Sequence, residues 1–395
     1  MSDFLKRTWA EINLDAICEN FKAIKNQVKK GTKILCVLKA DAYGHGAIAL
    51  AEQYEELGAD WFAVSNLEEA LQLRNAMITK PILILGYTPA NMAKVLSTFN
   101  ISQAVFTKSY AQELSKAALD ANCIVNAHIK LDTGMSRIGF VFHDEKRDLN
   151  SLLDIKEIST LDGINIEGMF THFAKSDESG QGIDFTKHQY ENFCFAVDYL
   201  KENGIDIPIK HCSNSAAILN YKEMNMDMVR AGLILYGFYP SDYNLSDVKL
   251  KPAIQLKTVI SQIKTIEENT AVSYGGKFIS KRKTKIATVP IGYADGYLRM
   301  LSGKAYMLIN GQRANVVGRI CMDQLMLDIT DIDDVSINDE VVVLGKSKNS
   351  EITLDELSSM MGTINYEFLC LLSKRIPRIY LKDNKTVSQL NYLCP

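Results

Sequence analysis

The sequence has no long hydrophobic run and no regular cysteine spacing, and these absences exclude several classes of protein. No stretch approaches the ~18 consecutive apolar residues that a membrane-spanning helix needs. The first residues lack an apolar core followed by a small-residue cleavage site. No two of the eight cysteines lie three residues apart, which argues against a zinc site or a disulfide framework. We therefore expect a soluble, cytoplasmic protein with reduced thiols and no metal.

The chain also lacks a large excess of charge of either sign. Its 44 basic and 47 acidic side chains leave a formal net charge of -3, so electrostatics favour neither nucleic acid nor an anionic membrane as a partner. Hydrophobic residues make up 47% of the 395 residues and charged residues 23%. That composition is typical of a globular protein and not of a disordered chain, collagen or a coiled coil. The length allows two or three domains.

Between about residue 30 and residue 235, short apolar runs alternate with amphipathic stretches of helical length. The eight runs are Ile34–Leu38, Trp61–Val64, Ile82–Leu85, Gln103–Phe106, Val125–Leu131, Ile166–Phe170, Ile209–His211 and Met226–Val229. Runs of this kind are typical of strands buried on both faces. Eight such units predict a closed (β/α)8 barrel. The alternative, an open doubly wound sheet, normally carries G-x-G-x-x-G after its first strand, and the sequence has no such motif.

The pattern changes after Gly237, where a loop-like segment leads into strand-like runs. These runs are Lys285–Val289, Ala305–Ile309, Gln312–Val317, Gln324–Ile329 and Glu340–Leu344. Asn310-Gly311 between two of them predicts a hairpin, because both turn positions require positive φ. We predict two domains, a (β/α)8 barrel over residues 1–240 and a mainly β domain over residues 241–395.

Capping signals and chain length predict helices between the strands. Ser65 with Glu68 is typical of a capping box at the start of a helix, and Thr353 with Glu356 predicts a short helix in the second half. Phe185–Asn203 is long enough for five helical turns and ends before a glycine, which is common after a helix C-terminus.

A lysine directly follows the first predicted barrel strand, at the end of the barrel where such enzymes have their active sites. By position alone, Lys39 is equally well explained as a snorkelling surface lysine. After it come Tyr43, which offers a hydroxyl, and two glycines, which let the backbone approach a ligand. The run Val37–Gly46 resembles the pyridoxal-phosphate attachment motif of alanine racemases. The resemblance extends along the chain from Thr8–Ile12 to Lys374–Arg378.

This resemblance implies a pyridoxal-phosphate-dependent alanine racemase in which Lys39 holds the cofactor as a Schiff base. It implies as ligands of the phosphate Tyr43, Ser215, Gly232, Leu233 and Tyr366, and as further cofactor-binding residues His172 and Asn214. Ser215 and Gly232 follow the seventh and eighth predicted strands, where barrel enzymes commonly bind phosphate. Taken alone, Ser215 is as readily a helix cap.

Arg230 ends the eighth predicted strand and matches the arginine that faces the cofactor's pyridine nitrogen in this family. A guanidinium keeps its proton, so it donates a hydrogen bond without protonating the ring, which should suppress transamination. His172 and His211 match a hydrogen-bonded chain with Arg230, although either alone could be a core histidine. Arg137 matches the arginine at the ring hydroxyl and substrate, with a surface salt bridge as the alternative. Lys130 matches a lysine that is carbamylated in some relatives.

Racemisation requires one base on each face of a planar intermediate. The resemblance supplies Lys39 for one face and Tyr274 for the other, although a tyrosine before Gly-Gly is more often an ordinary turn residue. A free phenol has a pKa near 10, so only about one in a thousand is ionised at pH 7, a penalty of roughly 4 kcal/mol. We expect the positive charge of the His172–Arg230 chain to reduce that penalty.

In the family, this tyrosine enters the active site of the other subunit. A methionine and an aspartate that match Met322 and Asp323 accompany it and bind substrate. The resemblance therefore implies a head-to-tail homodimer with shared active sites. Tyr293 and Tyr366 would narrow the entrance, and two aromatic rings there favour a small amino acid such as alanine.

Other functions stay open on the sequence alone. A racemase of broader specificity, acting on serine or lysine, would share the fold. A pyridoxal-phosphate decarboxylase would be expected to have a catalytic cysteine near an acidic residue, and Cys321-Met322-Asp323 matches that poorly. A non-catalytic cofactor carrier would resemble a lone barrel, which the second half of the chain argues against. The family implies a role in supplying D-alanine as a peptidoglycan precursor.

Overall fold

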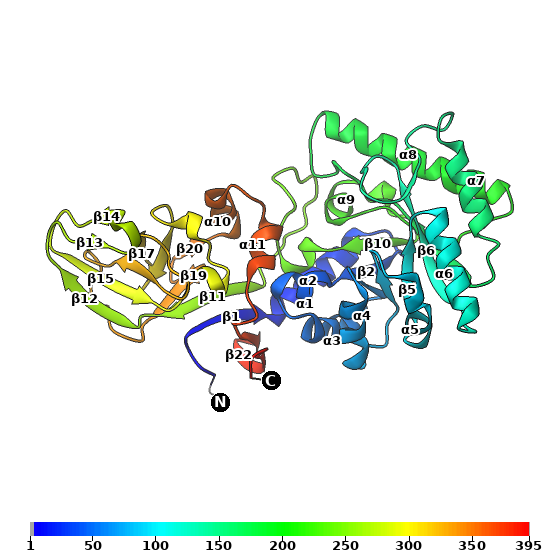
Figure 1. Cartoon of the computed structure of the whole chain (residues 1–395). Helices are drawn as coiled ribbons and strands as arrows, with labels where there is room; N and C mark the ends of the chain where they lie inside the picture. The colour runs from blue at the N-terminus through cyan, green and yellow to red at the C-terminus, as the bar shows by residue number, and fades with distance from the viewer. Residues whose placement is uncertain (1–3, 395) are drawn as a thin grey trace. The chain divides into compact units, whose positions relative to one another are not determined.

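The computed structural model describes residues 4–394, which fall into two compact units (Figure 1). The barrel unit comprises Cys18–Ala42 and Ala47–Lys251, and the β unit comprises the chain up to Ile17, Tyr43–Gly46 and the chain from Pro252 onward. In this described part, no helix is both long and apolar enough to cross a membrane.

Eight parallel strands form the barrel, in the order β10-β2-β3-β4-β5-β6-β8-β9. They are β2 (Lys33–Val37), β3 (Trp61–Val64), β4 (Ile82–Ile84), β5 (Ile101–Val105), β6 (Val125–Asp132), β8 (Ile164–Phe170), β9 (Ile209–His211) and β10 (Met228–Ala231). Backbone bonds from Asp227 to Lys210 (3.1 Å) and from Arg230 to Ser213 (3.0 Å) link the last two segments, so the barrel nearly closes. The predicted (β/α)8 barrel is confirmed, and each predicted run overlaps one of these strands.

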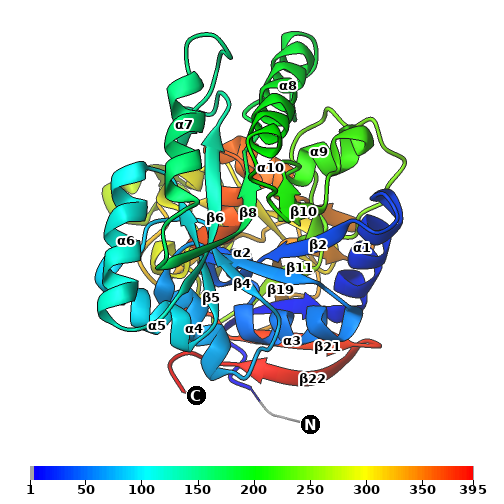
Figure 2. The same ribbon diagram turned by 90° about the vertical axis from the view of Figure 1, so that its right-hand side faces the viewer.

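Helices cover the outside of the barrel strands (Figure 2). The longer ones are α1 (Leu14–Gln27), α3 (Ala47–Leu57), α4 (Leu67–Asn75), α6 (Lys108–Asp120), α7 (Leu149–Ile158) and α8 (Gln181–Glu202). Helix α6 buries Leu114 and Ala118, which lie four residues apart on one face, against the strands. The shorter helices are α2 (Lys39–Gly44), α5 (Ala93–Thr98) and α9 (Ser215–Asn220).

Two of the predicted helix boundaries were wrong. Helix α8 begins at Gln181, four residues before the predicted start. Helix α4 is capped by Asn66, whose side chain accepts a hydrogen bond from the Glu69 amide, and not by Ser65. The Glu69 carboxylate in turn accepts from the Ser65 amide at 2.7 Å. The capping pair therefore exists one residue later than predicted, because Asn66 is the residue in extended conformation before the helix.

The β unit is built on one large sheet, ordered β12-β15-β18-β17-β16-β19-β11-β1-β21-β22, with β20 paired to β19. Its strands are β1 (Thr8–Asn13), β11 (Ile254–Val259), β12 (Gln262–Ile266), β15 (Thr284–Val289), β16 (Tyr306–Ile309), β17 (Gln312–Val317), β18 (Leu325–Asp328), β19 (Glu340–Ser347), β20 (Ser350–Ile352), β21 (Arg378–Lys382) and β22 (Lys385–Leu390). A small hairpin pairs β13 (Ala271–Val272) with β14 (Phe278–Ile279), and α10 (Leu354–Met361) and α11 (Asn365–Leu371) complete the unit. The predicted mainly β second half is confirmed.

Two local predictions in the β unit, a hairpin and a helix cap, are confirmed. Asn310 and Gly311 have φ values of 52° and 81° and join β16 to β17, as predicted. Thr353 caps α10 by accepting a hydrogen bond from the Glu356 amide. The N-terminal strand β1, which the sequence reading did not identify, lies between β11 and β21 in this sheet.

Candidate active site

The segment after Lys39 has an uncommon backbone conformation. Ala40 to Tyr43 are four consecutive non-glycine residues with φ between 51° and 55°, so this turn is left-handed. Such a conformation costs an L-residue roughly 1–2 kcal/mol. Hydrogen bonds hold it in place, from the Ala40 amide to Glu69 (2.7 Å) and from the Ala47 amide to Asp41 (2.9 Å). Backbone strain of this kind gathers at functional sites, which supports Lys39 as the centre of one.

The two glycines of this segment serve packing inside the β unit. A Cβ atom on Gly44 would lie 2.4 Å from the Leu369 carbonyl oxygen, and one on Gly46 would lie 1.9 Å from the Tyr380 hydroxyl. Both positions also have positive φ. The missing side chains of these glycines therefore leave room for neighbouring protein atoms, and not for a ligand as expected from the sequence.

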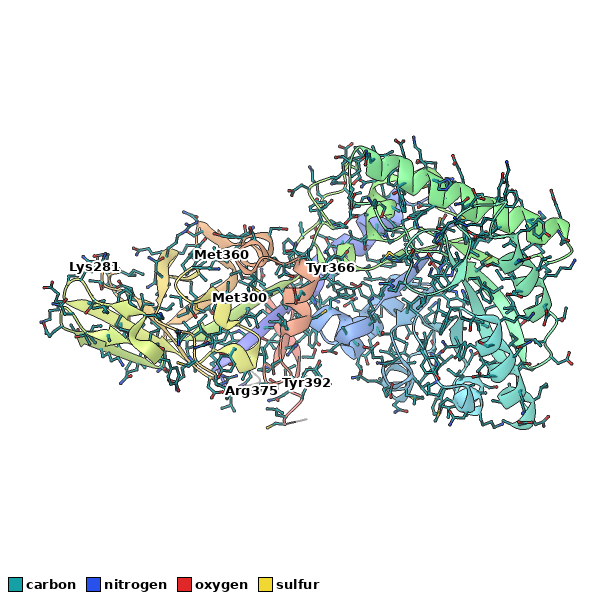
Figure 3. The ribbon with its side chains drawn as sticks, turned by 45° about the horizontal axis from the view of Figure 1, so that its top comes forward. Lys281, Met300, Met360, Tyr366, Arg375 and Tyr392 are labelled. Atoms are coloured by element: carbon teal, nitrogen blue, oxygen red, sulfur yellow. The ribbon has the colours of Figure 1, made fainter. Side chains whose placement is uncertain are left out.

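Tyr43 and Tyr366, both implied as phosphate ligands, lie next to one another in the β unit. Their ring centroids are 5.9 Å apart, and Tyr366 extends from α11 (Figure 3). Burial, followed by the neighbouring Tyr366 and Cys370, raises the pKa of Tyr43 far above that of a free phenol. Tyr43 therefore keeps its hydroxyl proton.

The buried Arg230 side chain lies near the end of strand β10 and is held by hydrogen bonds from two of its nitrogens. It is 3% exposed, and its two terminal nitrogens donate to the carbonyls of His211 (3.0 Å), Thr171 (2.7 Å) and Cys212 (2.9 Å). The same nitrogens contact the Nδ1 atoms of His211 (3.1 Å) and His172 (3.3 Å). Within the described residues, none of these bonds uses Nε. That N–H is the donor left for a ligand.

These contacts fix the proton positions on a buried chain of imidazoles. A guanidinium only donates, so His211 Nδ1 must accept and the ring proton lies on Nε2. His211 Nε2 is 2.9 Å from His128 Nδ1, which places the His128 proton on Nε2, 3.4 Å from a Glu167 oxygen. Burial, then Arg230 and His128, lowers the pKa of His211 well below that of a free imidazole. His211 is therefore a neutral imidazole between Arg230 and His128.

His128 and Glu167 were missed by the sequence reading. One signal was available: His128 lies two residues before Lys130 on the same strand, so both side chains point to one face. A second signal was Gly168, since a Cβ there would lie 2.3 Å from His128 Nδ1. A larger residue at position 168 would displace the histidine.

His172 is neutral as well. Burial, followed by Arg230 and Arg137, lowers its pKa well below the usual value. Because Nδ1 accepts from Arg230, the remaining proton lies on Nε2. In the His172–Arg230 chain, the positive charge therefore belongs to Arg230, and His172 offers a neutral N–H donor.

Lys130 is buried beside this cluster, and its ammonium nitrogen donates to the Leu131 carbonyl at 2.8 Å. Burial lowers the pKa of Lys130 to about 7, with Arg230 and Arg137 acting in the same direction and Asp132 opposing them. A substantial fraction of this amine is therefore uncharged near neutral pH. Only the uncharged form can react with carbon dioxide.

Arg137 follows a tightly held loop. One oxygen of Asp132 accepts hydrogen bonds from the amides of Gly134 (3.1 Å), Met135 (2.9 Å) and Ser136 (3.0 Å). Among the described residues, no carboxylate lies within ion-pair distance of Arg137, so the alternative of a surface salt bridge is not observed. The exposed guanidinium is available to a ligand.

A third cluster lies after the last two barrel strands. Asn214, and not Ser215, caps α9, because its side-chain oxygen accepts from the Ala217 amide at 3.0 Å. The buried Ser215 hydroxyl oxygen accepts from the Gly232 amide at 3.0 Å. Ser215 therefore keeps its hydroxyl hydrogen for another acceptor. Leu233 begins the short helix that follows Gly232.

In the β unit, Tyr274 lies 66% exposed in a turn after Ser273. The Ser273 hydroxyl donates to the Arg319 carbonyl at 2.6 Å, which ties this turn to the loop that leads to Met322 and Asp323. Met322 is also exposed, at 52%.

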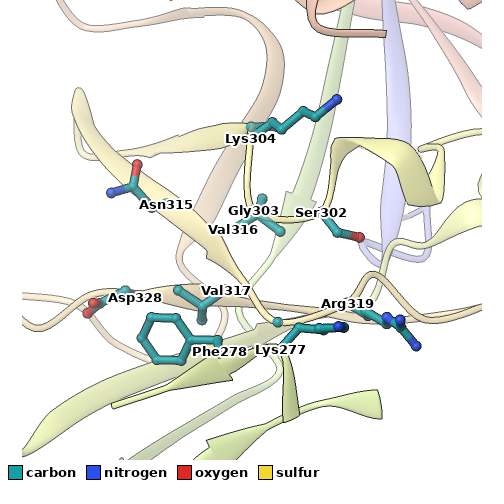
Figure 4. A pocket seen from close by; sticks show the side chains of 12 residues that line it. Lys277, Phe278, Ser302, Gly303, Lys304, Asn315, Val316, Val317, Arg319 and Asp328 are labelled. Atoms are coloured by element: carbon teal, nitrogen blue, oxygen red, sulfur yellow. The ribbon is translucent and has the colours of Figure 1, made fainter. Parts of the chain in front are cut away.

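A cavity of about 720 Å³ borders the residues after the Tyr274 turn (Figure 4). Three cationic side chains, Lys277, Lys304 and Arg319, and one carboxylate, Asp328, line it. The charged side chains that line this cavity are therefore mostly basic.

A barrel with a lysine after its first strand and a buried guanidinium–imidazole cluster defines an enzyme of the barrel class, whose active sites lie at the C-terminal ends of the strands. The chain matches the N-terminal domain of alanine racemase over residues 12–240 and the C-terminal domain over residues 253–380. It belongs to the alanine racemase family.

Individual relatives agree over the full length. An alanine racemase of Clostridium perfringens is 47% identical over 390 residues, covering 98% of this chain and 99% of the relative. One of Clostridium tetani is 44% identical over 395 residues, with 100% of both chains covered. The structure of an alanine racemase from Clostridium difficile 630 superimposes with a TM-score of 0.93 at 43% identity, covering 99% of this chain and 100% of that chain.

Proposed function

We propose that this protein interconverts L-alanine and D-alanine with pyridoxal 5'-phosphate as its cofactor. Membership of the alanine racemase family supports the reaction and favours it over a racemase of serine or lysine. The structural observation that carries the proposal is the buried Arg230 with one free donor, Nε. Supply of D-alanine for the cell wall, in the cytoplasm, is the role that we propose with it.

The described donors fit the cofactor's two polar ends. Arg230 has one N–H left to face an unprotonated pyridine nitrogen. Ser215 has a hydroxyl hydrogen left for a phosphate oxygen, and the Gly232 amide lies beside it. We further propose Asn214, Leu233, Tyr43 and Tyr366 as contributors to cofactor binding, and Arg137 as the partner of the ring hydroxyl and substrate.

The bound cofactor supplies a conjugated ring that delocalises the negative charge left when the α-proton is removed. Lys39 would hold it through Nζ. Arg230 would keep the ring nitrogen unprotonated, because a guanidinium donates a hydrogen bond without giving up its proton. By withholding its proton, Arg230 would favour return of the proton to Cα over transamination.

Two bases would then exchange the proton at Cα. We propose Lys39 Nζ on one face and the hydroxyl of Tyr274 of the partner subunit on the other. The neutral His172, with its proton on Nε2, is suited to donate a hydrogen bond to a phenolate, and Arg230 behind it supplies the positive charge. Charge on a phenolate is thus stabilised without a second cation.

The homodimer is part of the proposal, since it brings Tyr274, Met322 and Asp323 of one subunit to the Lys39 of the other. The Met322 amide would bind the substrate carboxylate. Tyr293 and Tyr366 would limit the entrance to small side chains. Lys130, in its uncharged form, would be carbamylated, and the new negative charge would offset the neighbouring Arg137 and Arg230.

Polarimetry of L-alanine with the purified protein and pyridoxal phosphate tests the function. The optical rotation should decay to zero, and D-alanine should decay at the same limiting efficiency because the two enantiomers are equal in free energy. L-Serine and L-lysine, run in parallel, should decay much more slowly. Release of carbon dioxide would indicate a decarboxylase, and a yellow protein inert toward both enantiomers would indicate a cofactor carrier.

A further inference from the structure

The turn Gly292–Gly296, which carries Tyr293, is built around a fully buried carboxylate. Asp295 accepts two hydrogen bonds from Arg7, at 2.6 Å and 3.3 Å, and one from the Gly292 amide at 3.0 Å. Arg7 also donates to the Pro290 carbonyl at 2.7 Å. A buried carboxylate is tolerated only when it is paired in this way, so the charge of Asp295 and the shape of the turn depend on one another.

This turn also orients the loop that contains Met322. The Tyr293 amide donates to the Cys321 carbonyl at 3.1 Å, and the Ala294 amide donates to the Met322 carbonyl at 3.0 Å. In a trans peptide the carbonyl and the following N–H point in opposite directions. Because the Cys321 carbonyl faces the turn, the Met322 N–H points away from it. No group among the described residues accepts a hydrogen bond from that N–H.

The turn Gly292–Gly296 packs closely against the loop that contains Met322. A Cβ atom on Gly292 would lie 2.3 Å from the carbonyl oxygens of both Cys321 and Met322. Gly296 has a φ of 103°, and a Cβ there would lie 2.3 Å from the Leu371 carbonyl oxygen. A shift of the turn by a few tenths of an ångström therefore moves the Met322 peptide with it.

Arg375, which is labelled in Figure 3, lies near the carboxylates of both Asp295 and Asp323. Its Nη2 donates to an Asp323 oxygen at 2.8 Å, and its Nε lies 3.9 Å from an Asp295 oxygen. The Ser373 amide donates to the Asp295 carbonyl at 3.2 Å. An unpaired Asp323 beside the Met322 amide would repel an incoming carboxylate, and Arg375 offsets that charge.

We propose that Asp295, held by Arg7, is a positioning residue that aims the Met322 N–H at the substrate carboxylate, and that Arg375 neutralises Asp323 beside it. This inference rests on the proposed function, since it requires Met322 to bind the substrate. Neither Asp295 nor the two arginines touches the reacting atoms. Their effect is on carboxylate binding and not on proton transfer.

Asp295→Asn is the direct test. Asparagine keeps the shape and one acceptor for the Gly292 amide but turns a donor toward Arg7. We expect the KM for L-alanine and D-alanine to rise together by about tenfold, a factor that corresponds to about 1.4 kcal/mol, with kcat within about threefold. Asp331→Asn is the matched control, because Asp331 is an exposed carboxylate of the same unit that pairs with Arg282. It should leave both constants unchanged.

Inhibition by propionate, a carboxylate without the reacting amine, supplies a readout that a merely structural role would not move. Its inhibition constant should rise with KM in Asp295→Asn and in Arg375→Met, and should recover in Arg375→Lys. Equal losses in kcat with unchanged KM and unchanged propionate inhibition would overturn the inference. If Asp295→Asn fails to fold, the Arg375 pair decides alone. Wild-type enzyme that does not racemise alanine would instead overturn the proposed function.

Discussion

Replacement of Arg230 by lysine tests the central cluster of the barrel. The guanidinium makes five contacts from two nitrogens, whereas an ammonium has three N–H donors on one atom. At least two buried acceptors therefore lose their partner. An unsatisfied buried acceptor costs about 1–3 kcal/mol, so Arg230→Lys should lower the free energy of unfolding by about 2–6 kcal/mol.

The same variant should change the products. Lys130 shows what this environment does to an amine, since its pKa is lowered to about 7. A lysine at position 230 should likewise lose its proton readily, and unlike arginine it could give that proton to the ring nitrogen. We expect more pyruvate, the transamination product of alanine, for each racemisation turnover.

Urea denaturation and a coupled pyruvate assay measure both effects. Arg147→Lys is the control, because Arg147 is an exposed arginine of the same unit that pairs with Asp148 at 2.9 Å. It should change stability by no more than about 0.5 kcal/mol. An Arg230→Lys variant that loses less than about 1 kcal/mol and forms no more pyruvate than wild type would refute the reasoning.

Three further predictions concern single groups. Lys39→Ala should abolish both the visible absorbance of the bound cofactor and nearly all activity, and retention of either would contradict the anchoring role. Burial lowers the pKa of Lys130 from 10.5 to about 7, so between these pH values the unfolded chain binds more protons than the folded one. The free energy of unfolding should therefore rise with pH from about 7 to 10.5, and Lys130→Met should flatten that rise. Nitrogen NMR should find the ring proton of His211 on Nε2, as its hydrogen bonds to Arg230 and His128 require. A proton on Nδ1 of His211 would show that the hydrogen-bond directions are wrong.

The barrel was predictable because its strands are buried on both faces. Such strands appear as short apolar runs, and each of the eight runs, from Ile34–Leu38 to Met226–Val229, overlaps an observed strand. The ends of the strands were less predictable. The predicted run Met226–Val229 begins and ends two residues before strand β10, because the apolar run stops at Val229 while pairing with β2 continues to Ala231. The Asn310-Gly311 hairpin was predictable for a different reason, the requirement for positive φ.

Long-range pairing was not predictable from local pattern. Strand β1 is six residues at the N-terminus, and its place between β11 and β21 depends on partners more than 240 residues away. Its Trp9 packs with Val259 and Ile379, which no periodicity near Trp9 indicates.

The candidate site also contains some features that the sequence predicts and others that it does not. Lys39 and Arg230 follow from their positions at strand ends together with the family resemblance. The left-handed turn after Lys39 has no signal in residues such as Ala40 and Ala42, because the conformation is imposed by bonds to Glu69 and Asp41 and not by preference. The charge state of His172 depended on burial, which the sequence does not report.

The most direct measurement of the two-base account is complementation between two inactive variants. Lys39→Ala and Tyr274→Phe subunits, mixed and reassociated, should form hybrid dimers in which one site has both an intact Lys39 and an intact Tyr274 from opposite subunits. Half of the dimers would be hybrids with one active site of two, so about a quarter of wild-type activity should return. No recovery, with hybrids demonstrated by mass, would contradict a base lent by the partner subunit.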